Sequence, residues 1–120
     1  CDAFWTIQEH YPKENLYAAL NLIGSHDRAR VLTVLGGDVN ALKMAMFLQF
    51  ALPGVPSIYY GDEAGMTGGT DPYNRGSFPW GKGNAPLTDF VRSLTAMYQE
   101  TPLLRRGEVY RHCTVYSFSK

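Results

Sequence analysis

The sequence of 120 residues has little of what marks several large classes of protein. It has no net charge, and no basic block beyond Arg105 and Arg106. Because a phosphate backbone needs several cations on one face, nucleic-acid binding is not expected. The longest apolar run, near Met44 to Leu52, is interrupted by Gln49 and is too short to span a membrane. A cationic start followed by an apolar stretch is also missing, so no signal peptide is visible.

Only two cysteines are present, Cys1 and Cys113. A disulfide between them would close nearly the whole chain, whereas two free thiols in a reducing compartment are the favoured interpretation and point to the cytoplasm. His112 and Cys113 are isolated neighbours, so no zinc-ligand spacing is found. The composition, 45% hydrophobic and 18% charged, is that of a globular protein. Aromatic residues make up 13% of the sequence and suit both protein cores and flat ligands.

Hydrophobic spacing predicts alternating helices and strands. After Pro12, the spacing of Leu16, Leu20 and Ile23 indicates a helix over residues 12–23, although Leu20 to Ile23 could equally begin a short buried strand. The further predicted elements are a short helix over 29–35, a helix from 38 to about 52 capped by Asp38, a buried strand over 55–60, a long loop over 61–86, an amphipathic helix over 87–98, and strands over 108–113 and 115–119.

This alternation is typical of parallel βαβ units. A two-stranded parallel sheet cannot bury both of its faces, and the helix over 38–52 is apolar nearly all round. The predicted fold class is therefore α/β, as part of a larger (β/α)8 barrel.

The pair His26 and Asp27 lies where a short strand would end, and parallel barrels carry their catalytic groups at such ends. An imidazole beside a carboxylate can bind adjacent sugar hydroxyls and stabilise positive charge on the ring. The alternative is that Asp27 caps the helix that begins at Ala29.

A second acidic pair, Asp62 and Glu63, does not fit the catalytic pair of a retaining glycosidase. Neighbours on an extended strand point to opposite faces, whereas that reaction needs carboxylates about 5–5.5 Å apart across one bond. At least one of the two is expected to be a structural acid with an arginine partner. Of Arg28 and Arg30, one could hold a catalytic carboxylate ionised through a charge-assisted bond, and the other is expected to be solvated.

In the glycine-rich loop, Asp71 and Arg75 are four residues apart and could bind one polyol if the chain turns at Pro72. The alternative is an internal bridge that fixes the loop. Phe78, Pro79 and Trp80 could form an aromatic platform, although a small core beneath the loop is favoured.

Three ordered blocks together resemble the α-amylase family, glycoside hydrolase family 13. Asn21 to Asp27 is similar to the fourth family signature, which ends the seventh barrel strand, and Gly54 to Glu63 is similar to the eighth strand. Gly65 to Gly69, followed by Asp71-Pro72, Arg75 and Phe78-Pro79-Trp80, resembles the neopullulanase, cyclomaltodextrinase and maltogenic amylase branch.

The resemblance implies a retaining hydrolase of α-glucosidic bonds in starch-like glucans, maltooligosaccharides or cyclodextrins. It makes Asp27 the transition-state stabiliser and His26, Asp71 and Arg75 substrate-binding residues. It implies no cofactor, and leaves calcium to the parent protein, with no site identified here. Residues 1–106 would end the barrel and residues 107–120 would begin a β-sandwich domain.

The nucleophilic Asp and acid Glu of the family would lie upstream of residue 1, so the isolated chain is predicted to be inactive. A glucan transferase or isomerase of the same family, and a non-catalytic sugar-binding or structural domain, stay open as alternatives. Oligomeric state and the choice between α-1,4 and α-1,6 bonds are not predicted.

Overall fold

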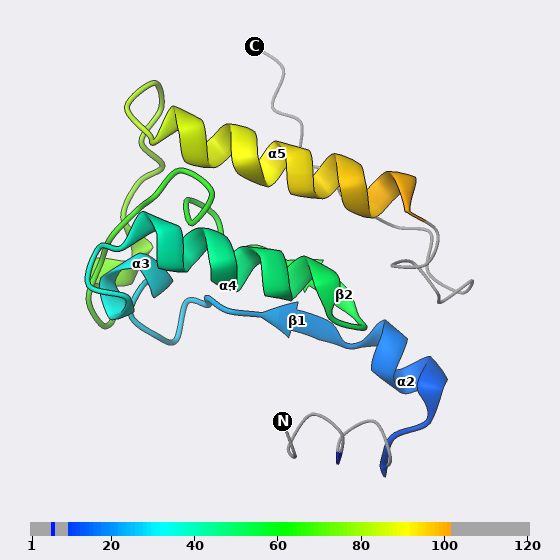
Figure 1. Ribbon diagram of the computed structural model, residues 1–120. Helices are drawn as coiled ribbons and strands as arrows, with labels where there is room; N and C mark the ends of the chain where they lie inside the picture. Colours follow the sequence, from blue (N-terminus) through cyan, green and yellow to red (C-terminus); the bar gives the residue numbers. More distant parts are fainter. Residues whose placement is uncertain (1–5, 7–9, 102–120) are drawn as a thin grey trace.

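The computed structural model describes residue 6 and residues 10–101 (Figure 1). Both cysteines, the strands predicted over 108–113 and 115–119, and the proposed domain at 107–120 lie outside the described residues. In chain order the elements are α2 (Lys13–Ala18), β1 (Leu20–Leu22), α3 (Val31–Val34), α4 (Val39–Ala51), β2 (Val55–Ser57), the 3-10 turn η1 (Tyr73–Arg75) and α5 (Ala85–Glu100). Within the described ranges, no helix is long and apolar enough to cross a membrane.

The two strands pair in parallel, as the alternation of elements predicted. Leu20 pairs with Val55 and Leu22 with Ser57. Helices α3 and α4 lie in the connection between them, and the Gln49 side chain of α4 donates to the carbonyl oxygens of Asn21 (2.8 Å) and Ser57 (2.7 Å). This buried amide therefore holds both strands against the helix. The carboxyl ends of the strands face the end of the molecule where α3 and the long loop lie (Figure 1).

The segment over 12–23 is a helix and a strand rather than one helix. Helix α2 ends at Ala18, and the next residues are extended because Leu20 to Leu22 pair with β2. The alternative of a strand was therefore right, but the expectation that it is buried was wrong. The side chains of Leu20 and Leu22 remain 60% and 57% exposed, since one helix layer covers only one face of the two strands.

Three other boundaries differ from those predicted. The helix expected over 29–35 is confined to α3, because Arg30 is extended before it and Gly36 and Gly37 have positive φ angles after it. The strand expected over 55–60 ends at Ser57 and is only half buried. Helix α5 begins two residues earlier than predicted, since Asn84 caps it by accepting from Leu87 N at 3.0 Å.

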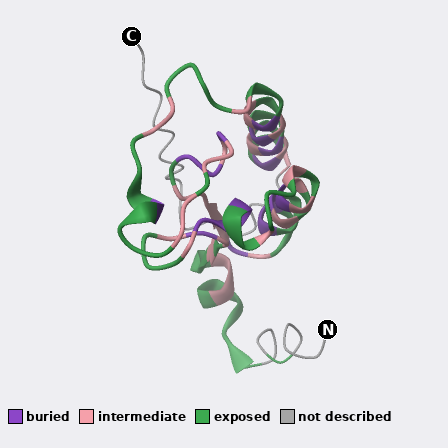
Figure 2. Cartoon of the chain, turned by 90° about the vertical axis from the view of Figure 1, so that its left-hand side faces the viewer, coloured by how far each residue is buried: buried purple, intermediate pink, exposed green. Residues whose placement is uncertain are grey.

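The core lies between α4 and α5, whose facing sides carry the buried residues (Figure 2). These are Leu42, Met46 and Phe50 from α4 and Leu87, Val91, Leu94 and Tyr98 from α5. The rings of Phe50 and Tyr98 meet edge to face at 6.0 Å, and the Tyr98 hydroxyl donates to Gly54 O at 3.2 Å. This places the amphipathic pattern predicted for α5 against the helix that joins the strands.

Helix α4 begins where the sequence predicted. Asp38 accepts hydrogen bonds from Asn40 N (2.8 Å) and Ala41 N (3.1 Å), which satisfies two amides of the first turn.

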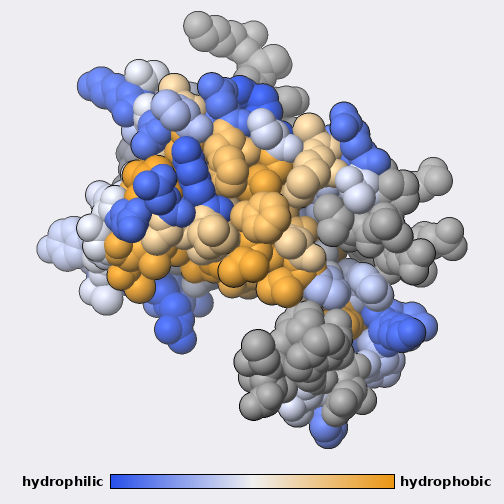
Figure 3. Space-filling view, in the orientation of Figure 1, coloured by the Kyte–Doolittle hydropathy of each residue, from blue (hydrophilic) through white to orange (hydrophobic). Residues whose placement is uncertain are grey.

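The opposite side of α4 is apolar and exposed. Met44, Phe47 and Leu48 are 61%, 44% and 50% exposed, and a continuous hydrophobic area covers this helix in Figure 3. Single exposed apolar residues are ordinary, but a contiguous area of this kind is typical of a surface that contacts another molecule or another part of a protein.

Candidate functional site

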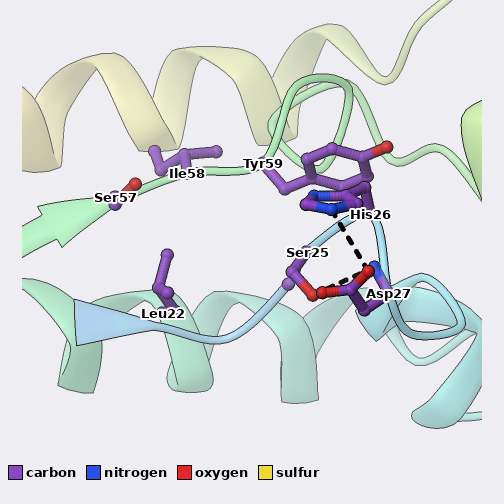
Figure 4. A pocket seen from close by; sticks show the side chains of 8 residues that line it. Leu22, Ser25, His26, Asp27, Ser57, Ile58 and Tyr59 are labelled. Carbon is purple, nitrogen blue, oxygen red and sulfur yellow. Dashed lines mark hydrogen bonds and ion pairs between the residues drawn. The ribbon is translucent and has the colours of Figure 1, made fainter. Parts of the chain in front are cut away.

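An open pocket of about 400 Å³ lies between the carboxyl ends of the two strands (Figure 4). The segment after β1 and its last residue supply one wall, and the end of β2 supplies the other. The lining residues are Leu22, Gly24, Ser25, His26, Asp27, Ser57, Ile58 and Tyr59. Two of the four candidate site residues, His26 and Asp27, therefore line a pocket at a strand end.

His26 and Asp27 form an exposed pair within this pocket. Nε2 of His26 lies 3.1 Å from Oδ1 of Asp27, and their side chains are 60% and 74% exposed. The Asp27 amide donates to Ser25 Oγ at 3.3 Å, which sets the turn after the strand (Figure 4). The two polar groups thus face solvent, where adjacent hydroxyls of a ligand can reach both.

The alternative role of Asp27 as a helix cap is not observed. The N-cap residue of α3 is Arg30, and it makes no side-chain capping bond. Arg28 is exposed, as expected for one of the two arginines. Arg30 is fully buried and pairs with Asp62, so the expectation that the second arginine holds a catalytic carboxylate was wrong.

Asp71 and Arg75 form an internal ion pair across η1. Arg75 Nε lies 2.7 Å from Asp71 Oδ1, and neither residue lines the pocket around His26. The chain does turn at Pro72, as the polyol-binding hypothesis required. Both side chains remain about half exposed, so they can still donate and accept bonds to a ligand.

Asn74 ties the loop to the pocket, a role that no pattern in the sequence indicated. Its fully buried amide donates to the carbonyl oxygens of His26 (2.7 Å) and Arg28 (2.8 Å). An asparagine in a Gly-rich loop resembles many turn residues, so only the three-dimensional contact reveals it. Because Asn74 lies between Asp71 and Arg75 in the sequence, the ion pair is held beside the His26 segment.

Tyr59 is the second residue that sequence reasoning missed. Its ring lines the pocket opposite His26, and its hydroxyl lies 3.5 Å from Asn74 O. Burial raises the pKa of the Tyr59 phenol and neighbouring Tyr60 adds to this, whereas the positive charges of Arg30 and Arg75 act in the opposite direction. Arg75 is thus within electrostatic reach of a pocket-lining ring.

The structural acid expected among the two neighbouring carboxylates is Asp62. It lies 3.2 Å from Arg30 Nη1, and both side chains are buried. Burial raises the pKa of Asp62 to about 6, against the opposing effect of the Arg30 guanidinium. The predicted carboxylate–arginine pair is confirmed.

The aromatic residues of the loop do not form a closed core. Trp80 is 68% exposed and its ring lies 4.7 Å from that of Phe78, whereas Phe78 and Pro79 are half buried. The small core favoured from the sequence is therefore wrong for Trp80. Among the described residues, no group of three or more His, Cys, Asp and Glu side chains could hold a metal ion.

Comparison with known proteins places this arrangement in a family. Residues 2–109 match the alpha amylase catalytic domain. A cyclomaltodextrinase from Geobacillus thermopakistaniensis is 46% identical over 90% of this chain and 19% of its own length. An amylopullulanase from Thermoanaerobacter thermohydrosulfuricus is 40% identical over 96% of this chain and 9% of its own length.

Among solved structures, the cyclic alpha-maltosyl-(1→6)-maltose hydrolase from Arthrobacter globiformis, in complex with maltose, superposes with a TM-score of 0.81. It is 40% identical over 88% of this chain and 24% of that chain. The fold is thus that of an α/β portion of an α-amylase catalytic domain. The chain belongs to the α-amylase family, glycoside hydrolase family 13, and its relatives include cyclomaltodextrinases, a maltogenic α-amylase and a neopullulanase. The resemblance found in the sequence is confirmed, while the chain spans 9–19% of the length of these first two relatives.

Proposed function

We propose that this chain supplies one wall of the active site of a retaining hydrolase of α-glucosidic bonds in starch-like glucans, maltooligosaccharides or cyclodextrins. The observation that carries the proposal is the placement of His26 and Asp27 in a pocket at the carboxyl ends of two parallel strands. Barrel enzymes carry their catalytic groups at that position. The names of the relatives, which act on cyclomaltodextrin and cyclic maltosyl-maltose, give the substrate class.

In this proposal Asp27 stabilises the positive charge that develops on the sugar ring, and His26 donates to hydroxyls of the same glucose unit. Both groups are exposed at 3.1 Å from each other, so one ring can contact the two together. Asp71 and Arg75 bind the next sugars as a preformed ion pair, held beside the pocket by Asn74. The pair presents an acceptor and a donor at fixed spacing, which suits a diol.

We further propose that β1 and β2 are the seventh and eighth strands of a barrel that a longer polypeptide completes, with residues 107–120 opening a β-sandwich. Exposed Leu20 and Leu22 on β1 and the apolar side of α4 support this, because each needs protein to cover it. The same exposure disfavours a stand-alone sugar-binding or structural domain. The nucleophile and acid come from the remainder of that barrel, so the isolated 120 residues are inactive.

The test is hydrolysis of maltooligosaccharides and cyclodextrin by the full-length polypeptide that contains this chain. Asp27→Asn should lower kcat by about 10²–10³-fold, the usual loss when a group that stabilises transition-state charge is removed. Asp89→Asn is the matched control, since its carboxylate is 69% exposed on α5. The isolated chain should show no hydrolysis.

Full activity of Asp27→Asn, or hydrolysis by the isolated chain, would refute the proposal. Product analysis separates hydrolysis from transfer or isomerisation, because water and sugar acceptors use the same carboxylates.

A further inference from the structure

Beneath the pocket lies a buried charged cluster that the proposed mechanism does not use. The guanidinium of Arg30 is fully buried, and its Nη1 donates to both Tyr60 O and Asp62 Oδ1. The rings of Tyr59 and Tyr60 lie 4.5 Å and 4.6 Å from its Cζ. The backbone amide of the same arginine donates to Gly68 O at 2.9 Å. One residue therefore contacts the segment after β2 and the glycine-rich loop together.

The cluster also touches both walls of the pocket. Asp62 packs directly under Gly24, because a Cβ added to Gly24 would meet Asp62 Oδ2 at 2.3 Å and Tyr59 Cβ at 3.5 Å. Gly24 and Tyr59 both line the pocket, one from each strand end. Asp62 therefore packs against Gly24 in one wall, and Arg30, which binds Asp62, lies against the ring of Tyr59 in the other wall.

Stability alone does not account for this pair. Burial of two charges costs desolvation that is recovered only when their remaining polar atoms are bonded. Here Nε and Nη2 of Arg30 and Oδ2 of Asp62 have no hydrogen-bond partner among the described residues. Apolar side chains of similar volume would fill the same space without that cost, so a purely structural role would favour them.

We propose that Arg30 and Asp62 are positioning residues, which hold the Gly24–Asp27 segment at a fixed distance from Tyr59 and from the glycine-rich loop. The inference rests on the proposed function, since the groups that they position are the proposed sugar contacts. The pair acts by geometry: Nη1 of Arg30 binds both Tyr60 O and Asp62, the guanidinium packs against the rings of Tyr59 and Tyr60, and Asp62 packs against Gly24. Asp27, three residues after Gly24, then meets the sugar ring at the correct place.

The test uses the full-length polypeptide, assayed on a maltooligosaccharide with kcat and KM determined separately. In Arg30→Met/Asp62→Leu both charges are replaced by apolar side chains, so the unfolding midpoint should stay near that of the parent. The inference predicts a 10- to 100-fold lower kcat, because small misplacements of catalytic groups have effects of roughly that size. Asp89→Asn/Arg92→Met is the matched control for the loss of an ion pair as such. It removes an exposed pair of α5 and should leave kcat and KM unchanged.

Arg30→Lys is the second variant, for the case that the double variant does not fold. Lysine keeps the buried charge but lacks the planar guanidinium that packs against the rings of Tyr59 and Tyr60, so kcat should fall about tenfold. Parent-like kinetics in either variant would overturn the inference while leaving the proposed function intact. If the parent itself hydrolyses no glucan, the proposed function fails, and crystal structures then decide the inference. A displaced Gly24–Asp27 segment in a variant supports it, and an unmoved segment refutes it.

Discussion

The substitution Gly24→Ala tests how tightly the end of β1 packs against Asp62. A methyl group at this position would lie 2.3 Å from Asp62 Oδ2 and 3.4 Å from its Cγ. The carboxylate cannot move away freely, because Arg30 Nη1 binds its other oxygen at 3.2 Å. Gly24→Ala therefore forces the β1 end away from Asp62. Overpacking of this kind costs about 1–3 kcal/mol in the free energy of unfolding.

The assay is denaturant unfolding of the full-length polypeptide beside kcat/KM on a maltooligosaccharide. Gly69→Ala is the matched control, because no atom lies within 4 Å of the added Cβ and no positive φ is involved. We expect Gly24→Ala to lose stability and activity together, whereas Gly69→Ala should match the parent. Equal behaviour of the two variants would refute the packing argument.

A double-mutant cycle identifies the responsible atom. If Asp62 Oδ2 is the obstacle, Gly24→Ala should cost much less in an Asp62→Ala background, with a coupling of about 0.5–3 kcal/mol, as found for residues in contact. An unchanged cost would refute this assignment, because the other neighbour of the added methyl group, Tyr59 Cβ, lies at an ordinary contact distance of 3.5 Å.

Two further predictions concern Asn74 and Asp62. Asn74→Ala removes the donor to His26 O and Arg28 O, and the loss of these bonds should cost about 1–3 kcal/mol and raise KM severalfold; a variant with parent stability and KM would contradict this. For Asp62, a folded-state pKa of about 6 lies above the ordinary 3.8, so the folded state holds the proton more tightly. Its contribution to stability is therefore complete below pH 3.8 and is lost as the pH rises through 6. The unfolding free energy of the parent, minus that of Asp62→Asn, should fall by up to about 3 kcal/mol across this window, and a flat difference in urea titrations would refute it.

Local signals in the sequence predicted those elements whose stabilising contacts are themselves local. The apolar spacing of α5 and the capping carboxylate of Asp38 both act within a few residues. The sequence did not decide between helix and strand at Leu20, because the outcome depends on pairing with Val55, far along the chain. Long-range pairing leaves no periodic pattern in three residues.

The residues of the candidate site also fall into two groups, those that the sequence predicted and those that it did not. His26 and Asp27 could be predicted from their position after a short strand, and the buried acid from the unsuitability of neighbouring carboxylates for catalysis. Asn74 and Tyr59 could not be predicted, since their roles depend on a loop that folds back onto the segment after β1. The sequence also could not choose between sugar contact and internal bridge for Asp71, and the bridge that is observed is compatible with both.

The high exposure of Asp27 indicates that further protein must cover the pocket before it can act as an active site. Asp27 is 74% exposed, and a carboxylate in that setting interacts weakly with charge because water screens it. Stabilisation of a transition state needs a site from which water is excluded. Within the described residues, β1 pairs only with β2 and leaves Leu22 exposed at the mouth of the pocket. We therefore expect that further strands, packed against this free edge, both enclose Asp27 and bring its two partner carboxylates, so that folding of the barrel and assembly of the active site are one event.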